Sequence, residues 1–422
     1  MANIPLPTPQ LDYDEWVVDS NDALHLHLVN PKVVSTSQNR TEPEIMTSFD
    51  PEFTEPVFGD KRKIFGYKGL HLDLYYSPSA LVSHLKMQWD AQHPSVTYNQ
   101  HEEPPAKRVK VTGYLTPAGG LAAGTIPSIA DHTDPAHVLT QYVVIDFQGE
   151  DLGPFTMKAQ QAEATFQPPG TVVHQYRLED GKEYVVYRAT FESPGFSAYH
   201  RRLRSFFLFL VDGASYIDED PHWEAYMTFQ TTPQDDQSVK YSIVGFTTVY
   251  NFFCYPDRVR PRISQFLILP PFAGQGHGTH LYEFLYQRWL QDPRVVDIVV
   301  EDPNDAFSDL RDRCDLKFLL SQGVSDHVVA PFDAAFLKTF RLRWKLSSRQ
   351  AARCLEMILL KKLDGTDSVQ SRKYRLQVKK RIYLQNQDEL IAMDAGERTS
   401  KLEEVFQLVH EDHQRMIDTL EV

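Results

Sequence analysis

The segment from residue 265 to residue 304 constrains the fold of this chain more than any other part of its sequence. An apolar run over 265–269 ends at two prolines, and three alternating glycines then open an amphipathic helix over 278–291. A second apolar run over 295–300 follows and ends in two carboxylates. A strand, a helix and a second strand in this order predict a parallel pair of strands within a mixed sheet.

The glycines of this loop are Gly274, Gly276 and Gly278. Glycine lets backbone N–H groups converge on a ligand without a side chain in the way, and a helix N-terminus adds oriented amides with partial positive charge. The loop therefore predicts a phosphate or pyrophosphate site, although a structural turn explains the glycines about equally well. The spacing is neither that of a Walker loop nor that of a Rossmann fingerprint.

The second apolar run ends in Glu301 and Asp302, and Pro303 and Asn304 then begin a helix expected over 305–320. Ligands of open sheets bind at the carboxyl ends of parallel strands, so Glu301 and the glycine loop should lie at one edge of the sheet. We expect Glu301 to be partly buried and functional. Asp302 is equally well interpreted as a cap of the following helix.

The remaining sequence falls into regions with different patterns, which predict an α+β fold. We expect an N-terminal mixed α/β domain over 1–136, a central domain over 137–325 and a C-terminal helical domain over 326–422. Prolines, glycines and small residues without an apolar period predict a mobile insertion over 91–136. Periodicity predicts strands at 23–29, 69–76, 183–190, 225–231, 241–250 and 263–269, and helices at 194–209, 332–344, 348–363 and 371–384, with a final helix whose apolar stripe runs from 402 to 420.

Charge is unevenly distributed along the chain, whose formal net charge is −14. Residues 1–60 contain eleven acidic and two basic residues, 338–381 contain fourteen basic and three acidic ones, and 388–422 contain ten acidic and three basic ones. An acidic chain favours a basic protein over a nucleic acid as a partner. We interpret the basic block as a solvated helical face, because few aromatic residues are interleaved with it, and we expect no direct DNA binding.

Cysteine usage and hydropathy exclude two further classes. Three cysteines without a close pair argue against a disulfide framework or a cysteine-based zinc site, so we expect a reducing compartment and no metal. The apolar runs fall far short of the ~20 residues that a membrane helix needs, and prolines open the chain where a secretory leader would carry an apolar run. We therefore expect no membrane partner.

Several segments together resemble a known family. The glycine loop and the strand end that follows it resemble motif A of the GNAT acetyltransferase superfamily. The wider set is similar to the catalytic subunits of type B histone acetyltransferases. The matching segments are FGDKRKIFGYKGL (58–70), ASYIDEDPHW (214–223), TVYNFFCYPDRVRPRISQFLILPPFAGQGHG (248–278), VVDIVVEDPNDAFSDLRD (295–312) and KYRLQVKKRIYL (373–384).

The resemblance implies a fold, which is a splayed GNAT sheet flanked by helices. It also implies an activity. The activity is transfer of an acetyl group from acetyl-CoA, without a metal, to lysines in the tails of newly made free histones, chiefly core histone four, before chromatin assembly. By matching position Glu301 is the general base of a ternary-complex reaction, assisted by Asp302 and Asp212. The cofactor would contact Phe266, Leu267, Ile268, Ala273, Gly274, Gln275, Gly276, His277, Gly278, Thr279 and Asn304.

One position of the loop departs from the superfamily pattern. A Gln or Arg usually stands three residues before the middle glycine, whereas this chain has Ala273. The backbone amide of Ala273 can still serve a pyrophosphate, but a side-chain contact is lost. We expect retained activity with weaker cofactor binding.

The resemblance also implies a groove for the histone tail. It would be lined by Asp60, Lys61 and Arg62, although the two basic residues stand where many relatives have acids. For Trp223 and Tyr250, packing in the core is an equally good explanation. The other groove residues are Trp223, Tyr250, Asn251 and Phe252.

Partners and location rest on weaker signals. The family works with a WD-repeat histone chaperone, and the sequence contains no recognisable docking peptide for it. The basic cluster Pro105–Lys110 is typical of a nuclear import signal, so we expect a cytoplasmic and nuclear protein. Two alternatives stay open: a GNAT enzyme for another protein or a small amine, and a catalytically weak histone-binding scaffold.

Overall fold

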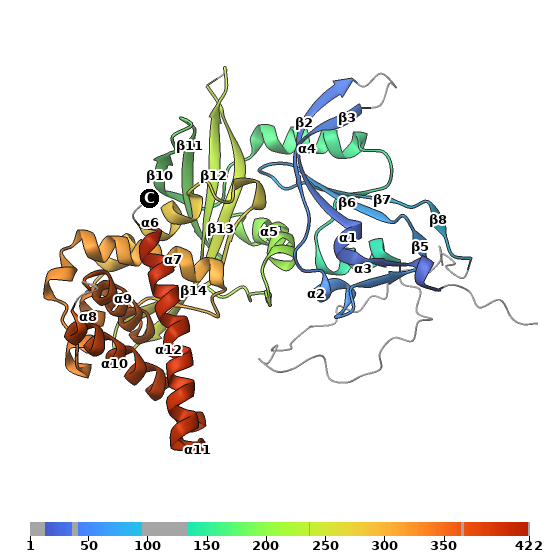
Figure 1. Cartoon of the computed structure of the whole chain (residues 1–422). Coiled ribbons are helices and arrows are strands. Elements are labelled where there is room, and N and C mark those ends of the chain that lie inside the picture. Colours follow the sequence, from blue (N-terminus) through green and yellow to red (C-terminus); the bar gives the residue numbers. More distant parts are fainter. Residues whose placement is uncertain (1–12, 36–40, 95–133, 236, 364–366, 421–422) are drawn as a thin grey trace, which may run out of the picture. The chain divides into compact units, whose positions relative to one another are not determined.

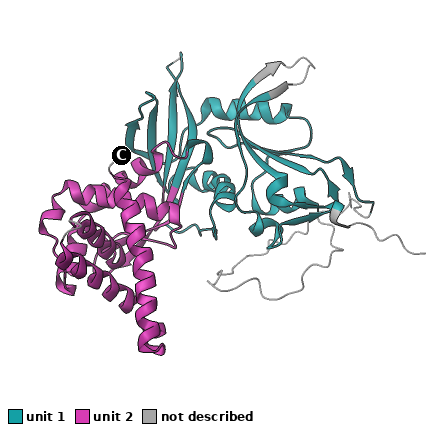
Figure 2. Ribbon diagram, viewed as in Figure 1, with its two compact units in different colours: residues 1–221, 226–246, 267–272 teal, residues 222–225, 247–266, 273–422 magenta. Residues whose placement is uncertain are grey.

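The computed structural model describes residues 13–35, 41–94, 134–235, 237–363 and 367–420. They form two compact units, which Figure 2 distinguishes by colour. The first unit comprises residues 1–221, 226–246 and 267–272, and the second comprises residues 222–225, 247–266 and 273–422. Most of the predicted insertion and the whole candidate import signal lie outside the described residues, and the division into three domains stays a prediction.

The first unit contains a five-stranded sheet with the strand order β3-β2-β6-β7-β9 (Figure 1). β2 runs parallel to β6 and antiparallel to β3, so the strands predicted at 23–29 and 69–76 are neighbours. Leucines at alternate positions of β2 and β6 are buried, as the period of two predicts. The strands are β2 (Leu24–Ser35), β3 (Thr41–Phe49), β6 (His71–Tyr76), β7 (Ser83–Gln88) and β9 (Phe147–Gln148).

Helices α4 and α5 belong to the same unit. α4 (Gly153–Thr165) contributes Phe155 and Ala159 to a core cluster with Val29, Tyr75 and Val82 of the sheet region. α5 (Phe196–Leu210) confirms the helix predicted at 194–209, and it buries a continuous run of apolar side chains. The shorter elements are η1 (Tyr13–Trp16), β1 (Val17–Asp19), α1 (Ser20–Ala23), α2 (Glu55–Phe58), β4 (Lys63–Phe65), β5 (Tyr67–Lys68), β8 (Ala91–Gln92) and α3 (Pro135–Tyr142).

A second sheet has the strand order β10-β11-β12-β13-β14-β15, and the boundary between the units falls within β12, β13 and β14. β10 and β11 are antiparallel, whereas β14 and β15 form the parallel pair that the sequence predicts. The mixed α/β architecture is therefore confirmed. The strands are β10 (Thr171–Arg177), β11 (Glu183–Thr190), β12 (Trp223–Pro233), β13 (Val239–Cys254), β14 (Arg258–Ile268) and β15 (Val299–Val300).

The prediction of a buried strand over 295–300 is wrong in length. Only Val299 and Val300 form a continuous strand, and both are half-buried, whereas Val295 pairs with Val259 of β14 through an isolated parallel bridge. The N–H of Ile298 donates to the carbonyl of Lys345 at 2.8 Å, away from β14. This contact comes from a residue 47 positions further along the chain, so the local apolar pattern contained no sign of it.

The C-terminal part of the second unit is helical, as predicted. A short turn, η2 (Pro270–Phe272), which belongs to the first unit, precedes the first of these helices, and η3 (Val324–His327) follows the second. Each helix from α7 onward, except α11, begins with a side-chain cap from Asn, Asp or Ser, which explains where it starts. The helices are α6 (His277–Gln291), α7 (Asp305–Ser321), α8 (Ala334–Trp344), α9 (Ser348–Lys361), α10 (Ser368–Gln385), α11 (Gln387–Ala392) and α12 (Ala395–Asp418).

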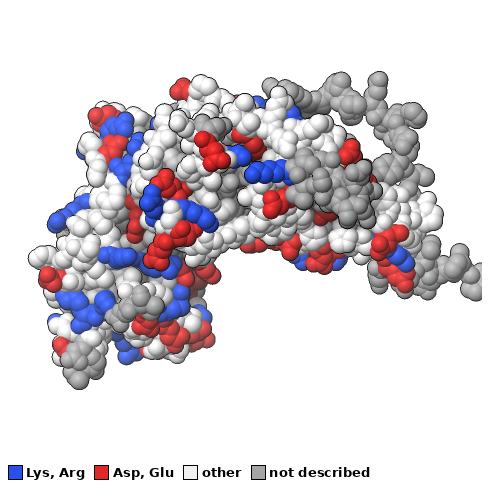
Figure 3. Space-filling view, turned by 90° about the horizontal axis from the view of Figure 1, so that it is seen from above, with Lys and Arg blue, Asp and Glu red and all other residues white. Residues whose placement is uncertain are grey.

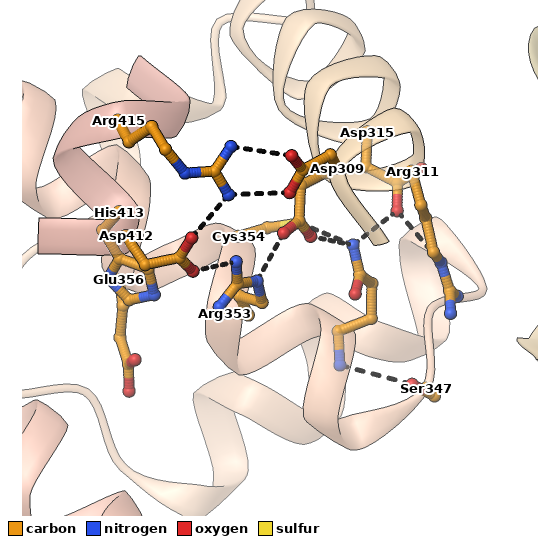
Figure 4. A network of polar contacts seen from close by, with 12 residues as sticks. Asp309, Arg311, Asp315, Ser347, Arg353, Cys354, Glu356, Asp412, His413 and Arg415 are labelled. Carbon is orange, nitrogen blue, oxygen red and sulfur yellow. Dashed lines mark hydrogen bonds and ion pairs between the residues drawn. The ribbon is translucent and has the colours of Figure 1, made fainter. Parts of the chain in front are cut away.

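Ion pairs connect α7, α9 and α12 (Figure 4), and Asp312 is the buried member among them. Arg353 of α9 pairs with Asp312 of α7 and with Asp412 of α12. Arg415 of α12 forms two hydrogen bonds of 2.7 Å with Asp309 of α7. α7 begins at Asp305, directly after the strand end that carries Glu301. The network therefore fixes the helix that follows the predicted catalytic residue.

Candidate active site

β14 and β15 diverge at the predicted catalytic edge. Their ladder consists of the pairs Arg262–Val299 and Ile263–Val300, and it closes with the N–H of Glu301 donating to the carbonyl of Ile263 at 2.9 Å. β14 continues to Ile268, whereas the segment that contains β15 turns away after Glu301. Within the described residues, the last part of β14 therefore has no β15 partner on that side. An extended ligand can add to such a strand edge.

Glu301 lies at this divergence, and its side chain is 37% exposed, so it is partly buried as expected. One carboxylate oxygen lies 3.0 Å from the guanidinium of Arg262. The other accepts a hydrogen bond from the hydroxyl of Ser264. These two contacts orient the carboxylate and leave part of it open to solvent.

Arg262 and Ser264 are residues that the sequence reasoning missed. They stand two apart on β14, so both side chains point to the same face of the sheet, which is the face that Glu301 reaches. From Arg260 to Ser264, polar and apolar residues alternate along β14, and this alternation was visible in the sequence. It did not reveal which strand end these polar residues would meet.

Asp302 and Asn304 have different structural roles. The side-chain oxygen of Asn304 accepts from the N–H of Phe307 at 2.9 Å and thereby caps α7. The alternative interpretation of Asp302 as this cap is therefore wrong. Asp302 is exposed and has a φ of 33°, a left-handed conformation that is uncommon for residues other than glycine and that turns the chain directly after Glu301.

The N-terminus of α6 has no side-chain cap. Gly276 occupies the N-cap position with a φ of 93°, and Gly274 has a φ of 73°. Both conformations favour glycine, which explains two of the three glycines in physical terms. The amides of the first turn, from His277 to Thr279, are thus arranged as in an anion-binding helix N-terminus. Ala273 and Gln275 belong to the same exposed turn region.

An aromatic series leads from the predicted groove residues to Glu301 within the second unit. Ring centroids of Trp223 and Tyr250 lie 4.9 Å apart, and those of Tyr250 and Phe252 lie 4.8 Å apart. The guanidinium of Arg262, which pairs with Glu301, lies 4.9 Å from the Phe252 ring. Trp223 is buried, which agrees with a role in core packing, whereas the ring of Phe252 is exposed.

Asn251 lies between the aromatic groove residues. Its backbone N–H donates to the carbonyl of His222 at 3.1 Å, and its side-chain amide contacts the same oxygen at 3.4 Å. These bonds fix β13 against the residue that precedes β12, and the Tyr250 ring packs against the rings of His222 and Trp223.

Phe266 lies on β14 in the second unit, and the other predicted site residues lie in the first unit. Asp60 and Lys61 are exposed in the turn after α2. Arg62 lies 3.8 Å from the carboxylate of Asp19 and 3.6 Å from that of Glu55, so its charge is compensated within the unit.

Asp212 follows the end of α5 and is exposed. Leu267 is buried and Ile268 half-buried on β14. A Cβ at Gly245 of β13 would lie 2.5 Å from the carbonyl oxygen of Leu267. Gly245, which the sequence reasoning also missed, therefore permits the close approach of β13 to the end of β14.

Charge on the surface is mixed in sign. Figure 3 shows acidic and basic side chains interspersed over the face that it presents. Among the described residues, no group of three or more His, Cys, Asp or Glu side chains is arranged to hold a metal ion. None of the helices in the described ranges is long and apolar enough to cross a membrane.

Comparison with known proteins gives consistent similarities. Residues 16–212 match the family described as "Histone acetyl transferase HAT1 N-terminus", and residues 312–364 match "Fungal HAT1, C-terminal". A protein of Cryptococcus neoformans var. neoformans serotype D named "Histone acetyltransferase type B catalytic subunit" is 34% identical over 96% of this chain and 98% of its own length. Proteins of the same name from Mycosarcoma maydis and Kluyveromyces lactis are 32% and 30% identical, over 96% and 97% of this chain and 88% and 94% of their own lengths.

A solved structure is similar over a smaller part. An aminoglycoside acetyltransferase from an uncultured soil metagenomic sample, in complex with sisomicin, is 15% identical. The similarity covers 31% of this chain and 86% of that one, with a TM-score of 0.23.

Proposed function

The chain belongs to the family of histone acetyltransferase type B catalytic subunits and is an acyltransferase, and we propose how and on what it acts. The proposed reaction transfers the acetyl group of acetyl-CoA to lysine ε-amines in the N-terminal tail of free, newly made histones, chiefly core histone four. The observation that carries this proposal is the divergence of β14 and β15 at Glu301, because it combines an oriented carboxylate with an open strand edge.

Acetyl-CoA would bind along the diverging edge of β14. Main-chain groups of Phe266, Leu267 and Ile268 would pair with the pantetheine arm and acetyl group, and one amide would polarise the thioester carbonyl. The turn from Ala273 to Thr279 would hold the pyrophosphate, since the α6 N-terminus has no side-chain cap. Asn304 uses its side-chain oxygen for capping, and its amide NH₂ would face the cofactor.

Deprotonation is the chemical difficulty of the transfer. A free lysine has a pKa of ~10.4, so only about one molecule in a few thousand is a nucleophile at pH 7. Glu301 would take the proton, directly or through a water, while Arg262 and Ser264 hold its carboxylate. The amine nitrogen then forms the bond to the acetyl carbon and the carbon–sulfur bond breaks. The nitrogen loses its second proton to the departing sulfur, so that the amide is neutral and CoA leaves as its thiol.

Within a ternary complex, two further carboxylates would assist this step. Asp302 and Asp212 would hold the lysine or relay its proton. The tail would lie against the aromatic series Trp223, Tyr250 and Phe252, with Asn251 between them and with Asp60 as its acidic contact. Lys61 and Arg62 would add little, because the charge of Arg62 is already compensated by Asp19 and Glu55.

A partner and a location complete the proposal. By family resemblance the enzyme would act with a WD-repeat histone chaperone in the cytoplasm and the nucleus. Fusion of residues 100–114 to a fluorescent reporter tests the import signal at Pro105–Lys110. A reporter that stays evenly distributed would remove that assignment.

Substrate specificity is tested with the full-length protein, acetyl-CoA and a set of histone tail peptides, followed by mass spectrometry. We expect acetylation of lysines near the start of core histone four and little release of CoA with small amines. Preference for small amines would indicate a different substrate class. Absence of any turnover would indicate a histone-binding scaffold.

A further inference from the structure

Helix α10 leaves one face uncovered. Its opposite face buries Tyr374, Val378 and Ile382, and α10 packs on α9 and α12 within the second unit. On the uncovered face, Val369, Leu376 and Leu384 are 60%, 57% and 59% exposed. Their spacings of seven and eight residues place them on one stripe of the helix, which extends over about four turns.

Basic residues fill the same stripe. Arg372, Lys373 and Lys380 lie three, four and eleven positions after Val369, which puts them between the exposed aliphatic side chains. No acidic partner contacts these three within the part of the chain that the structure describes. We call Val369, Arg372, Lys373, Leu376, Lys380 and Leu384 the α10 stripe.

The other cations of α10 behave differently. Arg375 and Lys379 both pair with Glu403 of α12, and Arg381 forms three hydrogen bonds of 2.8–3.0 Å with Glu356 of α9. The helix thus divides its six cations into three that hold it to its neighbours and three that face outward beside apolar side chains. A purely solvated helical face needs no exposed leucines between its charges.

We propose that the α10 stripe is a docking surface for an acidic protein segment that carries aliphatic residues at helical spacing. Carboxylates of such a segment pair with Arg372, Lys373 and Lys380, while its aliphatic side chains cover Val369, Leu376 and Leu384. This binding is separate from catalysis, because none of the proposed site residues belongs to α10.

Two other anionic surfaces fit less well. Nucleic-acid surfaces use aromatic side chains for base stacking, whereas the stripe offers three aliphatic ones. A membrane-bound helix inserts a wide apolar face, whereas these aliphatic residues are separated by about two turns each and alternate with cations. Acidic apolar protein segments satisfy both halves of the pattern.

The test uses the full-length protein and a displayed library of helical peptides of about 16 residues. Peptides are selected on the wild type and counter-selected on the double variant Leu376→Ser/Leu384→Ser. Binding of the recovered peptides is then measured by fluorescence anisotropy with that variant and with Lys373→Glu/Lys380→Glu. All four positions are half-buried or exposed on the surface, so folding is checked simply by thermal melting and by unchanged acetyltransferase activity.

The matched controls lie on other helices of the same unit. They are Leu408→Ser, where the leucine is 61% exposed on α12, and Lys338→Glu on the exposed face of α8. We expect recovered peptides with acidic and aliphatic residues at helical spacing, at least tenfold weaker binding to both stripe variants, and unchanged binding to both controls.

Four outcomes overturn the proposal. They are recovery of no peptides, recovery of peptides without acidic residues, equal binding by the stripe variants and controls, and loss of binding only in the charge-reversal variant. A DNA duplex or phosphatidylserine vesicles that bind the stripe more tightly than the recovered peptides also overturn it, and would assign the stripe to that other anionic surface.

Discussion

The second unit contains two sets of paired carboxylates with opposite environments. At the strand end, Glu301 is partly exposed and has one cation and one hydroxyl as partners. In the helical part, Asp315 and Glu356 are fully buried and surrounded by donors. A catalytic base needs access to its substrate, whereas a structural carboxylate needs its lone pairs satisfied. The same residue type is therefore used for chemistry in one place and for fixing helices in the other.

Burial of Asp315 and Glu356 carries an electrostatic cost, which their pKa values show. Tyr282 of α6 and Gln350 of α9 donate to the carboxylate of Asp315, each at 2.9 Å. Burial nevertheless raises the pKa of Asp315 to about 6. Burial likewise raises the pKa of Glu356, although Arg381 opposes the effect. These groups are retained in spite of an electrostatic penalty, which fits a role in specifying how α6, α7, α9 and α10 pack.

The largest expected effect is on turnover, and it distinguishes the exposed carboxylate Glu301 from the buried carboxylates Asp315 and Glu356. Glu301→Gln removes the proposed base while keeping the shape of the side chain, and we expect kcat to fall about 10²–10⁴-fold at pH 7. The melting temperature should stay near that of the wild type, because the side chain is partly exposed. Initial rates with a histone tail peptide and thermal unfolding measure the two quantities.

Glu411→Gln, on the exposed surface of α12, is the matched control for this variant. Wild-type turnover by Glu301→Gln would exclude Glu301 as the base. A large loss of stability would instead place Glu301 among the structural carboxylates and remove the contrast.

The second prediction concerns the buried pair. Arg381→Met leaves Glu356 without its guanidinium partner in a fully buried position. Loss of one partner of a buried pair costs about 3–5 kcal/mol of unfolding free energy. Chemical denaturation should show this loss, while kcat of the folded fraction changes little at low temperature.

The double variant Glu356→Met/Arg381→Met tests the reason for this effect. It removes both charges, and we expect it to recover most of the lost stability. If the double variant is as unstable as Arg381→Met, packing around Arg381 rather than an uncompensated charge is responsible.

The third prediction uses pH to probe the helical part. Burial, together with nearby Arg353 and Arg381, lowers the pKa of His413 to about 3, far below the ordinary value near 6.5. Between pH 6.5 and pH 3, His413 is protonated in the unfolded chain but neutral in the folded chain. The free energy of unfolding therefore keeps its full value with respect to His413 above pH 6.5 and decreases as the pH falls towards 3.

We expect the stability difference between the wild type and His413→Gln to change by about 1.4 kcal/mol per pH unit between pH 6 and 4. Urea denaturation at several pH values measures it. His327→Gln, at an exposed position, is the matched control. Parallel pH profiles of the wild type and His413→Gln would contradict the assignment.

The two regions also differ in what the sequence could predict. The partial burial of Glu301 and the position of the α6 N-terminus follow from local signals: an apolar run that ends in carboxylates, and alternating glycines. The start of α7 near Asn304 was predicted too, but Asp302 was offered as its cap where the structure has Asn304. Arg262 and Ser264 did not follow, because their partner is fixed by the pairing of β14 with β15. The network around Arg353 joins residues 41 and 59 positions apart, and no local pattern encodes which charges will meet.

Helix and strand positions were predictable for a similar reason. Amphipathic periods depend on neighbours along the chain, and α5, α6, α7 and α9 lie where these periods placed them. The short β15 was not predictable, since the Ile298 N–H bonds to Lys345 from a distant loop. Burial of charge in α9 was also hidden, because Glu356 is an ordinary helix residue until Arg381 is placed beside it.

A smaller effect is expected from the hydroxyl that orients the proposed base. Ser264→Ala removes the hydrogen bond to the Glu301 carboxylate and leaves the ion pair with Arg262. A bond to a charged but partly exposed group is worth about 1 kcal/mol, so kcat should fall by about fivefold or less. Steady-state kinetics measure this, with Ser308→Ala on α7 as the control. A loss as large as that of Glu301→Gln would mean that the hydroxyl itself takes part in proton transfer.

The smallest expected effect concerns the one departure from the family loop. Ala273→Gln restores a side chain that can donate to the pyrophosphate next to the uncapped α6 N-terminus. A single added hydrogen bond to an anion at an exposed site contributes about 1 kcal/mol, so the KM for acetyl-CoA should fall a few-fold while kcat stays constant. The substitution lies far in sequence from the buried carboxylates and should not change stability. If the KM for acetyl-CoA stays the same or rises, the backbone amides of the loop already hold the pyrophosphate fully, and the strand-end site tolerates Ala273 without loss.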